Sequence, residues 1–74
     1  MDYDQARSIA YAIKAKMSKG SNGYGIFLVD GKVISTRDNS TLFSRWEATG
    51  TPELIGRYKR SCPVQHIISD LVAL

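Results

Sequence analysis

The chain has 74 residues, a length that forms one small domain and buries only about 60% of the surface exposed by the unfolded chain. Its apolar fraction of 43% is too high for a disordered protein, and no run is long and apolar enough to cross a membrane. The net charge of +3 permits an acidic partner but does not require one. Cys62 is the only cysteine and Met1–Gly20 does not resemble a signal peptide, so we expect a cytoplasmic protein without disulfides.

The first segment, Asp2–Lys19, has the periodicity of an amphipathic helix. Its apolar residues recur at about 100° per residue and form one stripe, which consists of Tyr3, Ala6, Ile9, Ala10, Ile13 and Met17. Asp2 and Gln5 have the spacing of a capping box, and Gly20 can take the left-handed conformation that ends a helix. We expect the stripe to cover the segment that follows the loop Ser21–Gly23.

The stretch Tyr24–Thr36 is predicted to form a β-hairpin. Two β-prone apolar runs flank Asp30-Gly31, a pair that accepts the positive φ angles of a type I′ turn. This turn sets the register and predicts the pairs Val29 with Lys32, Leu28 with Val33, Phe27 with Ile34 and Ile26 with Ser35. Both faces of the ribbon are partly apolar. Because an isolated ribbon is marginal in water, other elements must pack on it.

The segment Thr41–Ala48 follows the polar breaker Arg37–Ser40 and fits two structures. A short helix could begin after Asn39 or Ser40. Its apolar face would consist of Leu42, Phe43 and Trp46. The Thr, Phe and Trp content favours instead a third strand that continues the hairpin. We expect the strand.

A helix is predicted to begin at Gly50-Thr51-Pro52-Glu53. Thr51 can cap this helix, and Pro52 suits its first position. It would run to about Arg60, and Glu53 would pair with Arg57 one turn later. Its apolar side would consist of Leu54, Ile55 and Tyr58. Gly56 in the middle weakens the prediction.

The last helix is predicted to open with Pro63 and to be capped by Ser61 or Cys62. Its apolar face comprises Val64, Ile67, Ile68, Leu71, Val72 and Leu74. Its polar side comprises Cys62, Gln65, His66, Ser69 and Asp70. The whole chain, residues 1–74, is therefore expected to form one α+β domain. This domain would contain an N-terminal helix, a two- or three-stranded antiparallel β-meander and two C-terminal helices.

The side of the first helix opposite its apolar stripe is a candidate surface for binding a protein. Small residues at Ser8, Ala12 and Ala15 would let another helix approach closely. Tyr and Arg side chains are common in protein interfaces, and the single Trp is either a core anchor or part of an interface rim. The predicted protein-binding residues are Arg7, Tyr11, Lys14 and Trp46. The alternative is that the alanines simply favour the helix and Tyr11 lies on an ordinary surface.

Basic residues suggest a second kind of surface. Lysine and arginine side chains that contact phosphates release counterions, and this release drives binding to nucleic acid. The candidate residues are Lys14, Lys16, Lys19, Arg57, Lys59 and Arg60. The competing interpretation is a solvated, solubilising surface, since acidic residues interrupt the basic ones.

Cys62, His66 and Asp70 follow one another at intervals of four residues along the last helix. They resemble a nucleophile, a base and an orienting carboxylate, but all three project from one helix with nothing to enclose a substrate. As zinc ligands, the cysteine and histidine would supply two of the usual four. We therefore assign no catalytic, metal or cofactor site.

The function expected from the sequence is that of a small non-enzymatic regulator or adaptor. It would bind a protein partner, without a cofactor or membrane contact, and homodimer formation is compatible with its generous apolar content. The alternative is a nucleic-acid-associated module that uses the basic helix surface.

Overall fold

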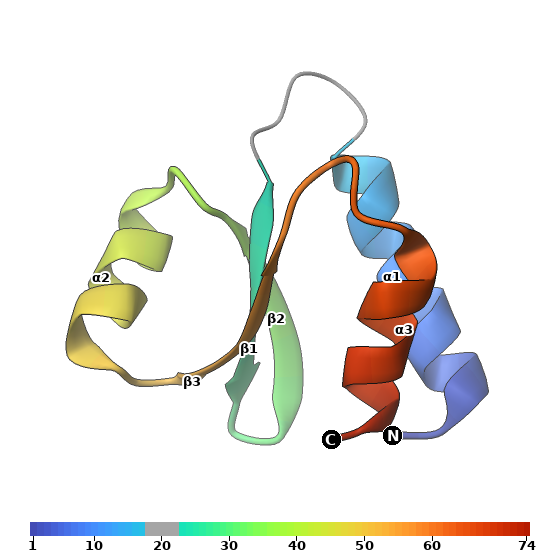
Figure 1. The fold of residues 1–74 in the computed structure, drawn as a ribbon. Helices are drawn as coiled ribbons and strands as arrows, with labels where there is room; N and C mark the ends of the chain where they lie inside the picture. The colour runs from blue at the N-terminus through green and yellow to red at the C-terminus, as the bar shows by residue number, and fades with distance from the viewer. Residues whose placement is uncertain (18–22) are drawn as a thin grey trace.

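A three-stranded antiparallel sheet stands at the centre of the fold, between one helix on one side and two helices on the other (Figure 1). The computed structural model describes residues 1–17 and 23–74. The elements in chain order are α1 (Tyr3–Lys16), β1 (Tyr24–Val29), β2 (Lys32–Arg37), α2 (Thr41–Thr49), β3 (Glu53–Tyr58) and α3 (Val64–Val72). The predicted α+β class, with an N-terminal helix, an antiparallel sheet and two further helices, is confirmed.

The hairpin forms in the predicted register. Asp30 and Gly31 have φ angles of 50° and 77°, as a type I′ turn requires, and Phe27 lies opposite Ile34. β1 is the central strand, because it pairs with β2 on one side and with β3 on the other. The expectation that other elements must cover this ribbon is confirmed on both of its faces (Figure 1).

The helix α1 begins as predicted, because the Asp2 carboxylate accepts a hydrogen bond of 2.8 Å from the backbone N–H of Gln5. It ends at Lys16, earlier than expected, and Met17 follows as its C-cap. The predicted capping glycine, Gly20, and most of the loop after it lie outside the described residues. Most of the apolar stripe is buried, but the side chain of Tyr3 is 51% exposed, so its place in the core was predicted wrongly.

The segment after β2 is the helix α2, and the predicted strand over Thr41–Ala48 is wrong. Ser40 caps this helix by accepting a hydrogen bond from the N–H of Phe43 at 3.0 Å. Phe43 then packs against the backbone of Gly25, where a Cβ atom would overlap the phenylalanine ring. Trp46, three residues later on the same helix face, meets Phe27 edge to face. Tertiary packing therefore decided this segment against its β propensity.

The segment predicted as a helix from Thr51 is instead the strand β3, so that prediction is also wrong. Its pairing with β1 places Tyr58 opposite Tyr24, and a bulge shifts the register between Ile26 and Phe27. Gly56 has a role that only a strand explains, because the Tyr58 ring folds back over it and leaves no room for a Cβ atom there. The predicted pair of Glu53 with Arg57 does not form, since the two residues now lie four positions apart along a strand.

The helix α3 forms in the predicted region but starts differently. Its N-cap is Pro63 and no side chain caps it, so the predicted caps at Ser61 or Cys62 are wrong. Its apolar face meets α1 and one face of the sheet. This core contains Ala6, Ala10, Ile13, Met17, Tyr24, Ile26, Tyr58, Ile67, Ile68 and Leu71. The two last apolar residues of the predicted face, Val72 and Leu74, are exposed.

Candidate functional site

The outer face of α1 carries the most distinctive surface among the described residues. Tyr3, Arg7 and Tyr11 follow at intervals of four, so their side chains form a column along the helix. Both tyrosines are 51% exposed, and the Arg7 guanidinium lies 5.1 Å from the centre of the Tyr11 ring. This cation–π contact holds a cation and an aromatic ring together in solvent.

The same face is slightly hollowed. A shallow depression of about 440 Å³ is lined by Asp4, Arg7, Ser8 and Tyr11. It therefore presents a carboxylate, a guanidinium, a hydroxyl and an aromatic ring to whatever approaches. We use "the outer face of α1" for these four residues together with Tyr3. Of its five members, the sequence analysis placed Arg7, Ser8 and Tyr11 on the candidate protein-binding surface and missed Tyr3 and Asp4. Tyr3 was expected to be buried, because its spacing places it on the apolar stripe.

Lys14 was also predicted to bind a protein partner, but its ammonium is engaged within the chain. It donates hydrogen bonds to the backbone carbonyls of Arg60 at 2.5 Å and Cys62 at 2.6 Å. Those carbonyls belong to the loop between β3 and α3, so Lys14 ties this loop to α1. Charge-assisted hydrogen bonds of this length are among the stronger ones in proteins.

Trp46 lies on the opposite side of the sheet from α1, so it does not share a surface with Arg7 and Tyr11 (Figure 1). Its ring centre is 4.9 Å from that of Phe27, which in turn contacts Phe43 at 5.5 Å. The side chain is half-buried. Its packing therefore fits the anchor that was one of its two sequence interpretations.

Several basic residues are brought together at one end of the molecule. The sheet register places Tyr24 between Arg37 of β2 and Tyr58 of β3. The Tyr24 hydroxyl accepts from Arg37 Nε at 3.4 Å and donates to the carbonyl of Lys16, the last residue of α1, at 3.5 Å. Residues 59 and 60 directly follow β3. We call this the basic end, and its exposed members are Lys16, Arg37, Lys59 and Arg60.

The remaining predicted nucleic-acid-binding residues lie elsewhere or are engaged. Arg57 forms an ion pair of 3.3 Å with Glu47 and lies 4.9 Å from the centre of the Phe43 ring. Lys14 holds backbone carbonyls, as described above. Lys19 lies outside the described residues. The structure therefore brings together half of the predicted basic set, and adds Arg37, which that set did not include.

The row of Cys62, His66 and Asp70 does not form a triad. Cys62 Sγ lies 3.8 Å from His66 Nδ1, but the Asp70 carboxylate accepts a hydrogen bond of 2.6 Å from the hydroxyl of Tyr58. Asp70 therefore orients a phenol of the sheet and not the imidazole. Burial, reinforced by the hydrogen bond to Asp70 and its negative charge, raises the pKa of Tyr58 far above its usual range.

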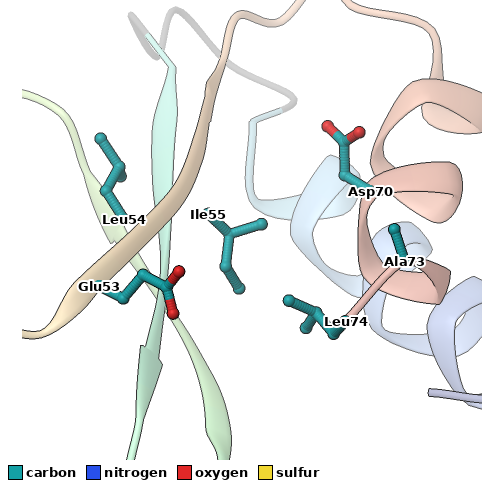
Figure 2. A pocket seen from close by; sticks show the side chains of 6 residues that line it. All are labelled: Glu53, Leu54, Ile55, Asp70, Ala73 and Leu74. Atoms are coloured by element: carbon teal, nitrogen blue, oxygen red, sulfur yellow. The ribbon is translucent and has the colours of Figure 1, made fainter.

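A second, smaller depression of about 270 Å³ lies between β3 and the end of α3 (Figure 2). Ile55 and Leu74 contribute its apolar wall. Figure 2 shows Glu53 and Ile55 on the side of β3 that faces α3, whereas Leu54 points to the other face of the sheet. Asp70 lines the depression as well, but it already accepts the hydrogen bond from Tyr58.

Over residues 1–17 and 23–74, no group of three or more His, Cys, Asp or Glu side chains is arranged to hold a metal ion. In the same residues no helix has the length and apolarity needed to span a bilayer. Comparison with protein-family models, with curated proteins and with solved structures finds no match.

Proposed function

We propose that this protein is a small non-enzymatic binding module that engages a protein partner through the outer face of α1. The observation that carries the proposal is the exposed column of Tyr3, Arg7 and Tyr11, with the guanidinium stacked on the ring of Tyr11. Tyrosine and arginine dominate the residues whose truncation weakens protein interfaces most.

Two further features support this surface. α1 is held rigidly, because its opposite side is buried against α3 and the sheet, and Lys14 fastens the loop before α3 to it. A partner would therefore lose little affinity to ordering of the helix. The surface also mixes charges, since Asp4 and Arg7 border the same depression. Such a mixture suits a protein surface better than a uniformly negative polymer.

A photo-crosslinking experiment tests the proposal in cells that naturally express the protein. Benzoyl-phenylalanine replaces Tyr11 in one version and Leu42 in a control version. Leu42 is 37% exposed and lies on α2, across the sheet from α1. We expect a specific protein to be captured at position 11 and not at position 42. Identical proteins at both positions, or nucleic acid alone at position 11, would contradict the proposal.

The captured partner then permits a quantitative test. Arg7→Ala and Tyr11→Ala should each raise the dissociation constant by roughly tenfold or more, as truncations at interface hot spots do. Both side chains are exposed, so the fold should be unchanged. The matched control is Lys32→Ala, an exposed residue of β2 away from α1. An equal effect of the control would show that the outer face of α1 is not the contact.

A second candidate function is binding to nucleic acid through the basic end. One observation favours it: residues far apart in the sequence, Lys16, Arg37 and Lys59, converge there in the tertiary fold. Clustered positive charge attracts the phosphate backbone, although Asp38 lies beside Arg37 and lowers the local charge. This candidate is tested through its response to salt.

A further inference from the structure

The outer edge of β2 carries unpaired backbone groups. β2 is the last strand on its side of the sheet. The N–H of Asp38 donates to the carbonyl of Gly23 at 3.2 Å, which continues the ladder between β1 and β2. Because the backbone direction alternates in an antiparallel strand, Ile34 faces β1 while Val33 and Ser35 face away. No residue that the structure describes forms a hydrogen bond with these two outward-facing backbones.

This edge lacks the features by which proteins usually prevent pairing with another strand. β2 has six residues in regular register, without a proline or a bulge, and its charges stand only at its two ends, Lys32 and Arg37. The other edge differs. β3 contains a bulge, and its outward Arg57 is paired with Glu47. The β2 edge is thus the one suited to accept another strand.

An apolar side chain is exposed in the middle of this edge. Ile34 is 36% exposed, although its sheet partner Phe27 is fully buried. The sheet is also narrow, because it consists of only three strands. A strand added beside β2 would cover the exposed side chain of Ile34 and widen the sheet by one strand.

We propose that the strand which pairs with β2 is β2 of a second copy of this chain. The pairing is antiparallel about a two-fold axis at Ile34 and joins the two three-stranded sheets into one. In this register Val33 of each copy lies opposite Ser35 of the other, so the outward N–H and carbonyl groups of both residues find partners. The two Ile34 side chains then lie side by side and shield each other from water.

Charge supports the same occupant. Lys32 of one copy falls opposite the neutral Thr36 of the other and diagonal to Asp38, which lies just beyond the strand. A register with Lys32 opposite Arg37 would oppose like charges, but it would also pair outward-facing backbones with inward-facing ones and is therefore excluded. The outward-facing backbones thus exclude every register that pairs an even-numbered residue with an odd-numbered one. Among the remaining registers, the one centred at Ile34 places the two exposed isoleucines beside each other. This dimer does not rest on the proposed function, because it is argued from the edge of β2 and not from the outer face of α1.

Sedimentation equilibrium of the full chain, from about 5 µM to about 500 µM, tests the dimer. Ile34→Lys places two lysines directly opposite each other and should raise the dimer dissociation constant by roughly tenfold or more. The matched control is Leu54→Lys. Leu54 flanks Phe27 from β3, on the same face of the sheet, and is 39% exposed, but it lies on the other edge. We expect the control to dimerise as the wild type does.

A measurement on the unmodified chain guards against misfolded variants. Amide hydrogen exchange of Val33 and Ser35 should slow at least tenfold between dilute and concentrated samples, because dimer formation protects their N–H groups. The outward N–H of Arg57 on β3 should not respond. A wild-type chain that stays monomeric throughout the concentration range would overturn the proposal. The proposal would also be overturned if Leu54→Lys weakened the dimer as much as Ile34→Lys does. The same holds if amide exchange of Arg57 slowed on concentration as much as that of Val33 and Ser35.

Discussion

At the scale of single residues, two polar side chains connect elements that are distant in the sequence. Lys14 of α1 binds the carbonyls that precede α3, and Tyr58 of β3 donates to Asp70 of α3. Each had another expected role, Lys14 as a contact for a partner and Tyr58 as part of a helix face. The hydrogen-bond acceptors of Lys14 and Tyr58 lie in distant parts of the sequence, and folding brings them within reach. The spacing of residues along the chain therefore does not reveal them.

Tyr58 makes stability depend on alkaline pH. Its pKa is raised by burial and by Asp70, so the folded chain keeps the phenol proton at a pH where the unfolded chain has released it. Unfolding therefore releases a proton above about pH 10, and stability must fall as the pH rises through this range. Below about pH 10 both states hold the proton, and the contribution is fully present.

We predict that the free energy of unfolding decreases more steeply above about pH 10 in the wild type than in Tyr58→Phe, by up to about 1.4 kcal/mol per pH unit. Urea titrations between about pH 8 and 11 measure this difference. Tyr3→Phe is the control, because Tyr3 is exposed and should keep the wild-type slope. Parallel pH curves for wild type and Tyr58→Phe would refute the assignment.

At the scale of elements, the first segment after the hairpin was predicted as a strand and is a helix, and the second was predicted as a helix and is a strand. Thr41–Ala48 is helical because Ser40 caps it and its aromatic residues dock on the sheet around Phe27. Residues 53–58 form a strand because β1 offers a free edge on that side. Each segment is short, and for short segments tertiary contacts outweigh local preference.

The contact of Gly25 with Phe43 is the steric condition for docking α2. We predict that Gly25→Ala destabilises the protein by about 2 kcal/mol, because its Cβ would overlap a ring that is only 1% exposed. The cost should shrink in a Phe43→Leu background, where the ring is absent. Gly31→Asn serves as the control, since the φ of 77° at this turn suits Asn and no atom lies within 4 Å. Chemical denaturation of the four variants gives the coupling. Equal cost of Gly25→Ala in both backgrounds would contradict the docking role.

At the scale of the whole molecule, charge is separated along the strand direction. Lys16 at the end of α1 and Lys59 and Arg60 after β3 belong to one end, and Asp30 in the hairpin turn and Glu53 at the start of β3 belong to the other. The separation is partial, because Lys32 lies beside the turn and Asp38 lies beside Arg37. The net charge of +3 gave no hint of this separation. Because of this arrangement, nucleic-acid binding through the basic end can be tested by the dependence of binding on salt.

We predict that a fluorescent single-stranded oligonucleotide binds at low salt and that Lys59→Gln combined with Arg60→Gln weakens its binding. The slope of log K against log salt should fall in magnitude by roughly 0.7 for each phosphate that the variant no longer neutralises. Lys32→Gln, close to the acidic turn, is the control and should leave the slope unchanged. Absence of binding at about 50 mM salt, or an equal weakening in the control, would eliminate nucleic acid as the partner.

The sequence by itself determined the elements whose signals are local. Asp30-Gly31 is sterically committed to its turn, so the hairpin register followed from adjacent residues, and Asp2 marked the start of α1. Of the candidate site, Arg7, Ser8 and Tyr11 were found because their spacing places them off the apolar stripe. Tyr3 was missed because it lies on that stripe and is nevertheless exposed.

Only the tertiary structure decided which later segment became α2 and which became β3, and which basic residues meet at one end. Those outcomes depend on surfaces contributed by distant parts of the chain: the bare backbone at Gly25, the free edge of β1 and the phenol of Tyr24. Local propensities differ by less than such contacts contribute. For that reason a short segment takes the structure that its neighbours in space can pair with or bury.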